Sequence, residues 1–349
     1  CSSDLPITVP LRRRPFAEQK VISAMVADQL KYGIIRYSKS EWRSLAMVVP
    51  KKTEPGEDPT TLPLEDRLRA VVDFRKVNDV TVGDEYPMPN VDEVVEAAAP
   101  GYLFTRLDVK SAFYQIPLAE DSRHITAFST SDGHYEYTRM PMGLKNSPAT
   151  WVRSVQLMLE GSKSSTAYFD DLAIHTARDK TTDNSYQDAY KKHLEDIKAM
   201  LDRLRRYNVK CTLHKCVFFT QSIRMVGYIL RDGTITTDPR KTQAIDYLTP
   251  HLSPEHLSRF LGFVSYYGRH HIFHLSAKTK PLRELLLKNA NWTWTPDHQD
   301  CVDALKTEIK RQIVRRAPDW TKPFILATDY SADGLAAVLA QHDDDGREV

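Results

Sequence analysis

Two adjacent carboxylates, Asp170 and Asp171, are the residues of this sequence best suited to chemistry. An aromatic pair precedes them and an apolar run follows, so residues 166–176 predict a tight hairpin with both aspartates at its tip. Like charges at one turn repel each other, and a divalent cation held between them removes that repulsion. A turn pair without a function is the competing interpretation, and the two aspartates alone leave the choice open.

A third carboxylate, Asp108, ends an apolar run over residues 103–107 that predicts a strand. Strands from distant parts of a sequence can lie side by side, which would gather Asp108, Asp170 and Asp171 into one cluster. Hard oxygen ligands of this kind suit Mg²⁺ or Mn²⁺ and not zinc. Two such ions about 3.5–4 Å apart can hold the attacking and leaving oxygens of a phosphoryl transfer.

Six segments resemble the motifs of retroelement reverse transcriptases. Residues 107–118 (LDVKSAFYQIPL), 139–149 (RMPMGLKNSPA) and 168–171 (YFDD) are similar to the first, second and third catalytic motifs. Residues 69–75 (RAVVDFR) resemble the fingers strand, and residues 225–228 (MVGY) resemble the primer grip. Residues 261–267 (LGFVSYY) are similar to a segment that follows the palm in gypsy-type LTR retrotransposons. The segments occur in the family's order, and the resemblance covers nearly the whole chain.

The resemblance implies an RNA- and DNA-templated DNA polymerase, a nucleotidyltransferase that extends a primer. In that family the primer's 3′ hydroxyl attacks the α-phosphate of a deoxynucleoside triphosphate, and two Mg²⁺ or Mn²⁺ ions are the cofactors. By resemblance Asp108, Asp170 and Asp171 are the catalytic residues and the metal ligands, and the carbonyl of Val109 adds a further ligand.

The resemblance also assigns residues to the nucleotide. Phe113 corresponds to an aromatic that closes on the sugar, where its ring would clash with a 2′-hydroxyl. Met142 departs from the family, in which some retroviral enzymes carry Gln and retrotransposons usually carry Phe. Taken alone, Phe113 is typical of a core residue, and Lys52 of a solvated edge strand. The full set expected to bind the nucleotide is Lys52, Arg69, Ser111, Ala112, Phe113 and Met142.

Contacts to primer and template are expected at the third motif and the primer grip. The residues concerned are Tyr168, Phe169, Lys145, Met225, Val226, Gly227 and Tyr228. The segment 185–225 adds nine Lys/Arg against four Asp/Glu, including Arg203, Arg205 and Arg206. Such a segment favours contacts to phosphates, although a charge-rich helix face is usually only solvated.

Two other groups of side chains could suggest metal sites. Cys211, His214 and Cys216 lie close together in the sequence, but their spacing is unusual for zinc and a fourth ligand is not evident. His270, His271 and His274 follow an aromatic run at helical spacing, and we interpret them as surface or packing residues.

The expected fold is α+β, a right-hand polymerase of fingers, palm and thumb with an antiparallel palm sheet. Residues 1–100 are expected to form an N-terminal arm and the fingers, and residues 101–238 the palm, with a fingers insertion at about 117–145. Residues 239–320 are expected to form the thumb and connecting helices. Residues 321–349 resemble the start of a ribonuclease H domain, with Asp329 as its first metal carboxylate. Because only twenty residues follow Asp329, we expect that metal site to be incomplete in this chain.

Local patterns predict several of the helices. One runs from residue 17 to about residue 32. Another begins with Ser147 as its N-cap and Pro148 in its first turn. A third, at residues 188–207, is amphipathic, and its apolar side carries Leu194, Ile197, Leu201 and Leu204.

Composition limits the partners and the compartment. With 48 Lys+Arg and 46 Asp+Glu the net charge is +2, so nucleic acid would have to be bound by local clusters. Four unevenly spaced cysteines favour a reducing compartment. There is no apolar run that could span a bilayer and no secretory signal.

We therefore expect a cytoplasmic protein, in a virus-like particle of a retroelement and not at a membrane. Its expected partners are a primed RNA or DNA template, deoxynucleoside triphosphates and other products of a pol polyprotein. The start at Cys1 and the stop within a polar hairpin suggest that the chain was cut from a longer protein.

Two rival interpretations are weighed against this one. A decayed, non-catalytic nucleic-acid-binding copy of the element is disfavoured because Asp108, Asp170 and Asp171 are all present. An intron-type or non-LTR reverse transcriptase is disfavoured because those families lack the 261–267 pattern and an adjoining ribonuclease H strand of this type.

Overall fold

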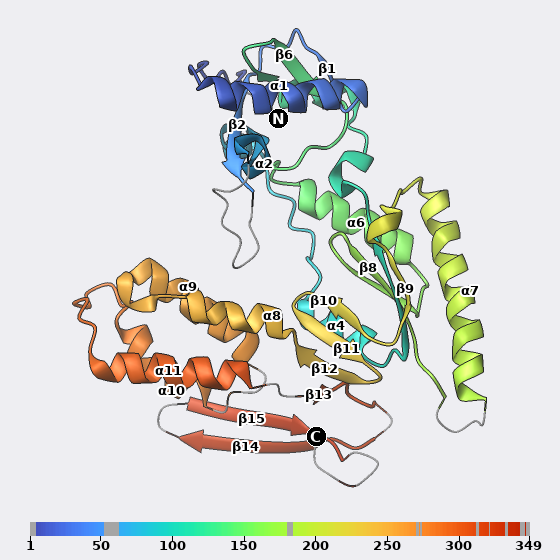
Figure 1. Ribbon diagram of the computed structural model, residues 1–349, viewed down its shortest axis with the longest axis vertical. Coiled ribbons are helices and arrows are strands. Elements are labelled where there is room, and N and C mark those ends of the chain that lie inside the picture. Colours follow the sequence, from blue (N-terminus) through green and yellow to red (C-terminus); the bar gives the residue numbers. More distant parts are fainter. Residues whose placement is uncertain are drawn as a thin grey trace.

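The computed structural model describes residues 5–51, 63–179, 184–269, 272, 274–311, 314–320, 322–331, 334–342 and 346. Helices accompany sheets that are mainly antiparallel, as the α+β prediction expected. Figure 1 shows a sheet covered by a helix at the top, a second sheet backed by helices at the right, and a helical region at the lower left. Within these ranges, the structure has no helix that is both long and apolar enough to cross a membrane.

The upper region, the fingers, is built on a five-stranded sheet in the order β1-β6-β5-β2-β3. All neighbouring strands are antiparallel except β2 and β5. Helix α1 (Phe16–Lys31) covers one face, where Ile22 and Val26 pack in one core with Val72 and Phe128, and the predicted first helix is thus confirmed. The strands are β1 (Ile35–Tyr37), β2 (Ser44–Pro50), β3 (Leu68–Asp73), β5 (Phe128–Ser129) and β6 (His134–Tyr137).

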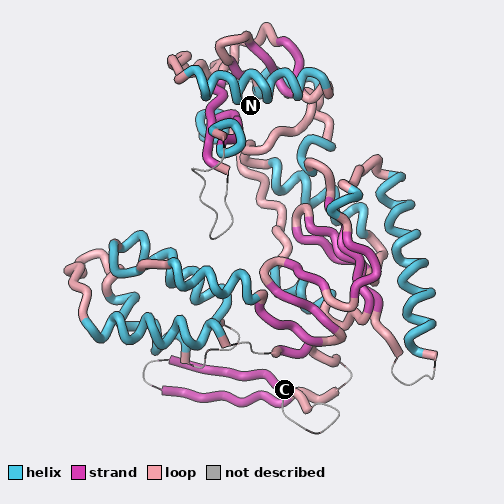
Figure 2. The backbone as a smooth tube through the Cα atoms, in the orientation of Figure 1, coloured by secondary structure: helices cyan, strands magenta, loops and turns pink. Residues whose placement is uncertain are grey.

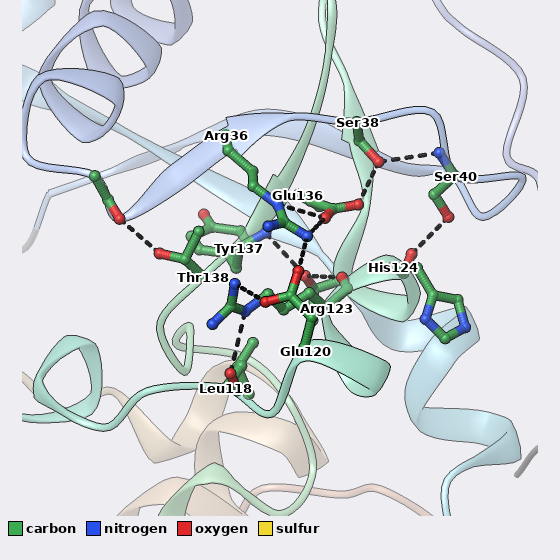
Figure 3. A network of polar contacts seen from close by, with 12 residues as sticks. Arg36, Ser38, Ser40, Leu118, Glu120, Arg123, His124, Glu136, Tyr137 and Thr138 are labelled. Carbon is green, nitrogen blue, oxygen red and sulfur yellow. Dashed lines mark hydrogen bonds and ion pairs between the residues drawn. The ribbon is translucent and has the colours of Figure 1, made fainter.

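A buried carboxylate, Glu136 on β6, is at the centre of the polar network in Figure 3. The Arg36 side chain donates to it from Nε at 2.8 Å, and the Ser38 hydroxyl donates to its other oxygen. Arg36 also pairs with Glu120, which in turn pairs with Arg123. An unpaired buried charge would be costly, so the network favours one arrangement of β1, β6 and helix α5 (Glu120–Arg123).

The central region, the palm, is a four-stranded antiparallel sheet in the order β7-β8-β4-β9. Its strands are β4 (Leu103–Asp108), β7 (Ser165–Tyr168), β8 (Asp171–Thr176) and β9 (Val217–Thr220). One face packs against α6 (Ser147–Leu159) and α7 (Ser185–Arg206), and the other packs against α4 (Val91–Ala98). Figure 2 shows α7 running along the outer side of these strands.

The start of α6 and the place of α4 correct the sequence-based expectations. Asn146 is the residue that precedes α6, and the hydroxyl of Ser147 donates instead to the Pro141 carbonyl at 2.9 Å. Residues 1–100 were expected to form the arm and the fingers, yet within them Val95 and its neighbours on helix α4 pack with Phe104 of the palm sheet. An apolar stripe shows that a helix is buried on one side but does not identify the sheet that covers it.

The buried side of α7 is also rotated from the predicted one. Ile197 and Leu204 are buried as expected, whereas Leu194 is 59% exposed and Leu201 is 46% exposed. His193 turns inward in their place, and its ring is hydrogen-bonded between the hydroxyls of two threonines of the sheet. A polar residue with bonding partners on the sheet therefore occupies a position that the apolar pattern alone would give to leucine.

The lower region, the thumb, is helical and follows a second four-stranded sheet. That sheet contains β10 (Ile223–Met225), β11 (Tyr228–Arg231), β12 (Thr234–Thr237) and β13 (Arg315–Arg316). The thumb helices are α8 (Pro239–Thr242), α9 (Pro254–Gly268), α10 (Leu275–Glu284) and α11 (Pro296–Lys310), with Phe260, Leu282 and Leu305 in their core.

Strands β14 (Ile325–Ser331) and β15 (Gly334–Ala340) form a separate pair. The connecting helices are α2 (Leu64–Arg67), α3 (Arg75–Val80), η2 (Ala112–Gln115), η3 (His124–Thr126), η4 (Leu213–Lys215), η5 (Gln243–Tyr247) and η6 (Pro250–Leu252).

Candidate active site

The structure brings the predicted carboxylates to one end of the palm sheet. Asp108 is the last residue of β4 and lies directly opposite Asp171, the first residue of β8. Asp170 occupies the turn that joins β7 to β8 and is exposed. Side chains directly opposite each other on antiparallel strands have Cβ atoms roughly 4.5–5.5 Å apart. Like charges in such a pair are destabilising, so the sheet alone does not favour this arrangement.

The neighbouring negative charges affect the pKa of Asp171. Burial raises the pKa of the Asp171 carboxyl, Asp170 and Asp108 raise it further, and Arg106 opposes them. Within the described ranges, no three His, Cys, Asp or Glu side chains are already grouped as a ready metal site. The donors nevertheless fit a divalent cation, because they are hard carboxylate oxygens with mutual repulsion that a cation would relieve.

A tryptophan fixes the turn that carries Asp170. Phe169 has a φ of 54°, an uncommon conformation for a residue other than glycine. The indole Nε1 of Trp151, on α6, donates to the Phe169 carbonyl at 2.9 Å. Trp151 is 2% exposed, so this bond is shielded from water. The spacing of Trp151, Val155 and Met158 in the sequence predicts one apolar side of this helix but gives no sign of this hydrogen bond.

A pocket of about 270 Å³ lies beside the turn, and it gathers many of the predicted nucleotide-binding residues. Phe113 contributes its ring, which meets Trp151 edge to face with centroids 6.5 Å apart. Met142 is 54% exposed at the rim. The lining comprises Val109, Ser111, Ala112, Phe113, Tyr114, Met142, Trp151, Phe169 and Asp170.

Two predicted contact residues with described positions, Arg69 and Lys145, are not part of this pocket. Arg69 lies on β3 opposite Val49 with an exposed side chain. Lys52 lies outside the described residues. The ammonium of Lys145 donates to the Thr81 carbonyl at 2.9 Å, which joins the second motif to the segment after α3. The roles of Arg69 and Lys145 therefore stay predictions.

The predicted primer-grip residues divide into a buried pair and a turn. Met225 and Tyr228 are each 2% exposed and pack in the palm core, so their side chains support the turn and do not present themselves to a ligand. Between them, Val226 has a φ of 49° and Gly227 a φ of 84°. The hydroxyl of Tyr266, on α9, donates to the Val226 carbonyl at 2.9 Å.

That contact joins the thumb to the turn, and there is little space around it. A Cβ added at Gly227 would lie 2.7 Å from the Tyr267 hydroxyl, so a larger residue would displace that side chain and would also be strained at a φ of 84°. Tyr266 and Tyr267 belong to the 261–267 motif, but the motif alone did not indicate what their hydroxyls contact.

Helix α7, the helical part of the basic segment 185–225, does not face the aspartates, whereas the stretch after it runs beside Asp108, where the Thr212 backbone donates to the Asp108 carbonyl at 2.8 Å. Helix α7 packs in one core with Leu107 and Leu172, whose side chains point to the opposite face of the sheet from Asp108 and Asp171. Arg203 is engaged there, because it donates to carbonyls at the end of α6. The structure therefore gives no support for contacts from this helix to a duplex at the aspartates.

The structure shows the surroundings of the other residues that could suggest a metal site. The Cys216 thiol accepts a hydrogen bond from the Asp108 backbone at 3.4 Å, and burial raises the pKa of the Cys211 thiol to about 11. His274 immediately precedes α10, whereas His270 and His271 lie outside the described residues. Asp329 lies on β14 opposite Ala336, and its assignment to a ribonuclease H site stays a prediction.

Family models match two separate parts of the chain. Residues 49–230 match the family described as reverse transcriptase (RNA-dependent DNA polymerase). Residues 294–349 match an RNase H-like domain found in reverse transcriptase, a match that includes α11 and begins before the expected boundary at residue 321.

Curated relatives are polyproteins of mobile elements. The chain is 31% identical over 342 residues to the retrovirus-related Pol polyprotein from transposon 412 of Drosophila melanogaster, covering 97% of this chain and 26% of that protein. It is 33% identical over 341 residues to the Pol polyprotein from transposon gypsy of the same organism, covering 93% of this chain and 31% of that protein. The chain thus spans about a quarter to a third of the length of these relatives. The predicted similarity to gypsy-type elements is confirmed.

Solved structures share the fold at low identity. A foamy viral protease-reverse transcriptase in complex with double-stranded DNA matches with a TM-score of 0.81 at 19% identity, covering 99% of this chain and 57% of that one. A foamy viral protease-reverse transcriptase in complex with an RNA/DNA hybrid matches with a TM-score of 0.78 at 19% identity, covering 99% of this chain and 44% of that one. The predicted right-hand polymerase fold is confirmed.

Proposed function

The chain belongs to the reverse transcriptase (RNA-dependent DNA polymerase) family, and from this we propose that it copies an RNA or DNA template by adding deoxynucleotides to a primer 3′ end. One observation carries the proposal. Asp108 lies opposite Asp171, Asp170 occupies the adjoining turn, and a pocket of about 270 Å³ opens beside them. Acidic groups at the mouth of a pocket lined by an aromatic ring suit a reaction on a nucleoside triphosphate.

We assign two Mg²⁺ or Mn²⁺ ions to Asp108, Asp170 and Asp171, with the Val109 carbonyl as a further ligand. When bound, such ions lower the pKa of an attacking hydroxyl and neutralise charge on the leaving pyrophosphate. The protein's part is to hold the carboxylates in place. Strand pairing fixes Asp108 against Asp171, and the Trp151 hydrogen bond fixes the turn of Asp170.

The nucleotide would occupy the pocket beside the turn. Phe113 would lie against the sugar, with Ser111 and Ala112 beneath it and Met142 at the rim. Arg69, from the fingers, would reach the triphosphate, for which a guanidinium offers bidentate hydrogen bonds. Lys52 is proposed for the same task.

The primer end would be held by the turn at Val226 and Gly227, together with Tyr168 and Phe169 of the hairpin. Tyr168 packs in the same core as Met225 and Tyr228, so the hairpin and the turn are mechanically joined. Tyr266 stabilises the turn from the thumb through its bond to the Val226 carbonyl.

Replacing Tyr266 with Phe is expected to slow primer extension. Burial raises the pKa of the Tyr266 hydroxyl, so it remains a protonated donor at neutral pH. Loss of one such bond costs about 1 kcal/mol, and the single-turnover extension rate should fall roughly fivefold. Tyr267→Phe is the matched control, since no hydrogen bond from its hydroxyl was found in the described residues. Equal losses in both variants would show that the slower extension does not come from loss of the hydrogen bond between Tyr266 and Val226.

The cellular location is also part of the proposal. A retroelement polymerase of this kind would work in the cytoplasm, within a virus-like particle, beside other products of its polyprotein. The relatives are Pol polyproteins of transposons, which supports the association with other products of a polyprotein.

Primer extension by the purified chain tests the proposed function. A labelled DNA primer on RNA and on DNA templates should be extended with deoxynucleoside triphosphates and Mg²⁺, and a chelator should stop extension on both. Ribonucleoside triphosphates in place of the deoxynucleotides serve as the specificity control. Absence of extension on both templates with either Mg²⁺ or Mn²⁺, by a protein that binds the primer–template, would overturn the proposal.

A further inference from the structure

A second pocket, of about 250 Å³, opens on the fingers where the N-terminal arm meets the sheet. Consecutive arginines of the arm, Arg12, Arg13 and Arg14, form one wall, and the end of β5 with the turn after it contributes Ser129, Thr130 and Ser131. The remaining lining residues are Leu11 of the arm, Gln19 and Ile22 of α1, and Leu45 and Ala46 of β2. No lining residue is shared with the pocket beside Asp170.

The arm is held in place by its backbone and by one of its arginines. Val9 donates from its backbone to the Arg43 carbonyl at 2.9 Å, and Arg43 donates back to Ile7 at 2.8 Å. Further along, Arg14 pairs with Glu18 at 3.3 Å, and the Gln19 side chain donates to the Arg14 carbonyl. The pocket wall is therefore positioned without using the other two guanidinium groups.

The charge near the pocket is unevenly balanced. The described lining contains no carboxylate, and two that adjoin lining residues in the sequence are engaged: Glu18 by Arg14, and Asp132 by the hydroxyls of Ser23 and Ser131. Arg12 and Arg13 are exposed, and in the part of the chain that the structure describes they form no ion pair or hydrogen bond. A guanidinium offers a rigid fork of donors that matches phosphate oxygens.

We propose that Arg12 and Arg13 bind phosphates of the unpaired template strand, ahead of the base pair that is being formed. This inference rests on the proposed polymerase function. Proteins hold single-stranded nucleic acid along positively charged grooves that follow its backbone. Adjacent, exposed guanidinium groups at the wall of a pocket supply such a charge, and because the lining, as far as the structure describes it, contains no aromatic ring, we assign the contact to phosphates and not to stacked bases.

The position of the pocket on β2 favours the template over the duplex. Leu45 lines the pocket, and four residues further along the strand Val49 pairs with Arg69, the residue proposed for the triphosphate. That separation is about 13 Å at roughly 3.3 Å per residue. A template base pairs with the incoming nucleotide, so in the proposed function the next few unpaired nucleotides would lie on the side of the triphosphate where this pocket opens. The completed duplex would extend the other way, past the turn at Val226 and Gly227 that contacts the thumb.

The test compares primer–templates that differ only in the length of the 5′ template overhang, from one to ten nucleotides, without added nucleotide. Affinity for the unaltered chain should increase with overhang length and then level off. The double variant Arg12→Gln/Arg13→Gln should lose most of that increase and bind the one-nucleotide overhang normally. On the long overhang, its slope of log K against log salt should be shallower by about 1.4, because each phosphate contact to a single strand contributes about 0.7.

A matched control removes the same charge elsewhere. Arg205→Gln/Arg206→Gln alters two adjacent exposed arginines on α7, and this variant should keep the full gain from the overhang. The proposal is overturned if the affinity of the Arg12/Arg13 variant increases with overhang length as much as that of the unaltered chain. It is also overturned if the variant loses the same affinity on every overhang length. A raised KM for deoxynucleotides with an unchanged gain would mean that the site holds triphosphate instead. Primer extension with the one-nucleotide overhang is measured in parallel, so that a failure of the polymerase function is recognised separately.

Discussion

Replacing Asp170 with Asn is expected to reduce primer extension at least about a hundredfold, the loss typical when one group that stabilises the transition state is removed. The amide keeps the shape of the side chain but removes the negative charge that would hold a divalent cation. Asp170 is exposed at its turn, so folding should be unaffected. Stability should if anything rise slightly, because Asp170 is one of the charges that raise the pKa of Asp171.

The measurements are single-turnover extension and, separately, equilibrium binding of the primer–template. Binding should change by less than about twofold, since exposed carboxylates contribute little to binding a polyanion. Asp300→Asn, at an exposed position on α11, is the control for loss of one surface charge. Near-normal extension by the Asp170 variant would remove this residue from the active site, and a parallel loss of binding would mean that its role is structural.

Replacing Phe113 with Val is expected to raise the use of ribonucleotides relative to deoxynucleotides at least tenfold. The Phe113 ring lines the pocket and leans edge to face on Trp151, so it is held in one place. A fixed ring against the sugar leaves no room for a 2′-hydroxyl, and about 1.4 kcal/mol of relieved clash corresponds to a factor of ten. Valine keeps an apolar, branched surface and removes most of the ring.

The quantity to compare is the ratio of kcat/KM for a ribonucleotide to kcat/KM for the matching deoxynucleotide. Deoxynucleotide use alone is less informative, because it should also decline when the ring that supports the sugar is lost. Tyr114→Phe alters the neighbouring residue of the same pocket but keeps its ring, so its ratio should stay constant. If the ratio in the Phe113 variant also stays constant, Phe113 is ordinary core, and Met142→Leu would show whether the rim residue selects the sugar.

The carboxylate cluster was predictable because each of its parts is local. The apolar run before Asp108 and the hairpin around Asp170 and Asp171 each specify a strand end, and antiparallel pairing brings those ends together. The fingers helix was predictable for a similar reason, since its apolar spacing needs no knowledge of the partner.

The supporting contacts could not be predicted, because they join residues whose patterns are independent. The Trp151 bond to the Phe169 carbonyl spans 18 positions, and the Tyr266 bond to the Val226 carbonyl spans 40. Apolar periodicity places both rings in a core but does not specify where an N–H or O–H points. The same limit explains Ser147, which was expected to cap its own helix but whose hydroxyl donates to the Pro141 carbonyl.

The fingers sheet combines strands that come before β4 of the palm with strands that come after it, and this order affects how the chain folds as it is synthesised. Strands β1 to β3 end at Asp73, but β5 and β6, which lie between β1 and β2 in the sheet, begin only at Phe128. Strand β4 of the palm is therefore synthesised before the fingers sheet can be completed, and β4 can pair with β8 only later still. Until β5 has been synthesised, one edge of β2 is unpaired, and an unpaired strand edge is prone to association with other chains. A fragment that ended at residue 100 would keep that edge permanently, so the fingers are not a module that can be excised at that point.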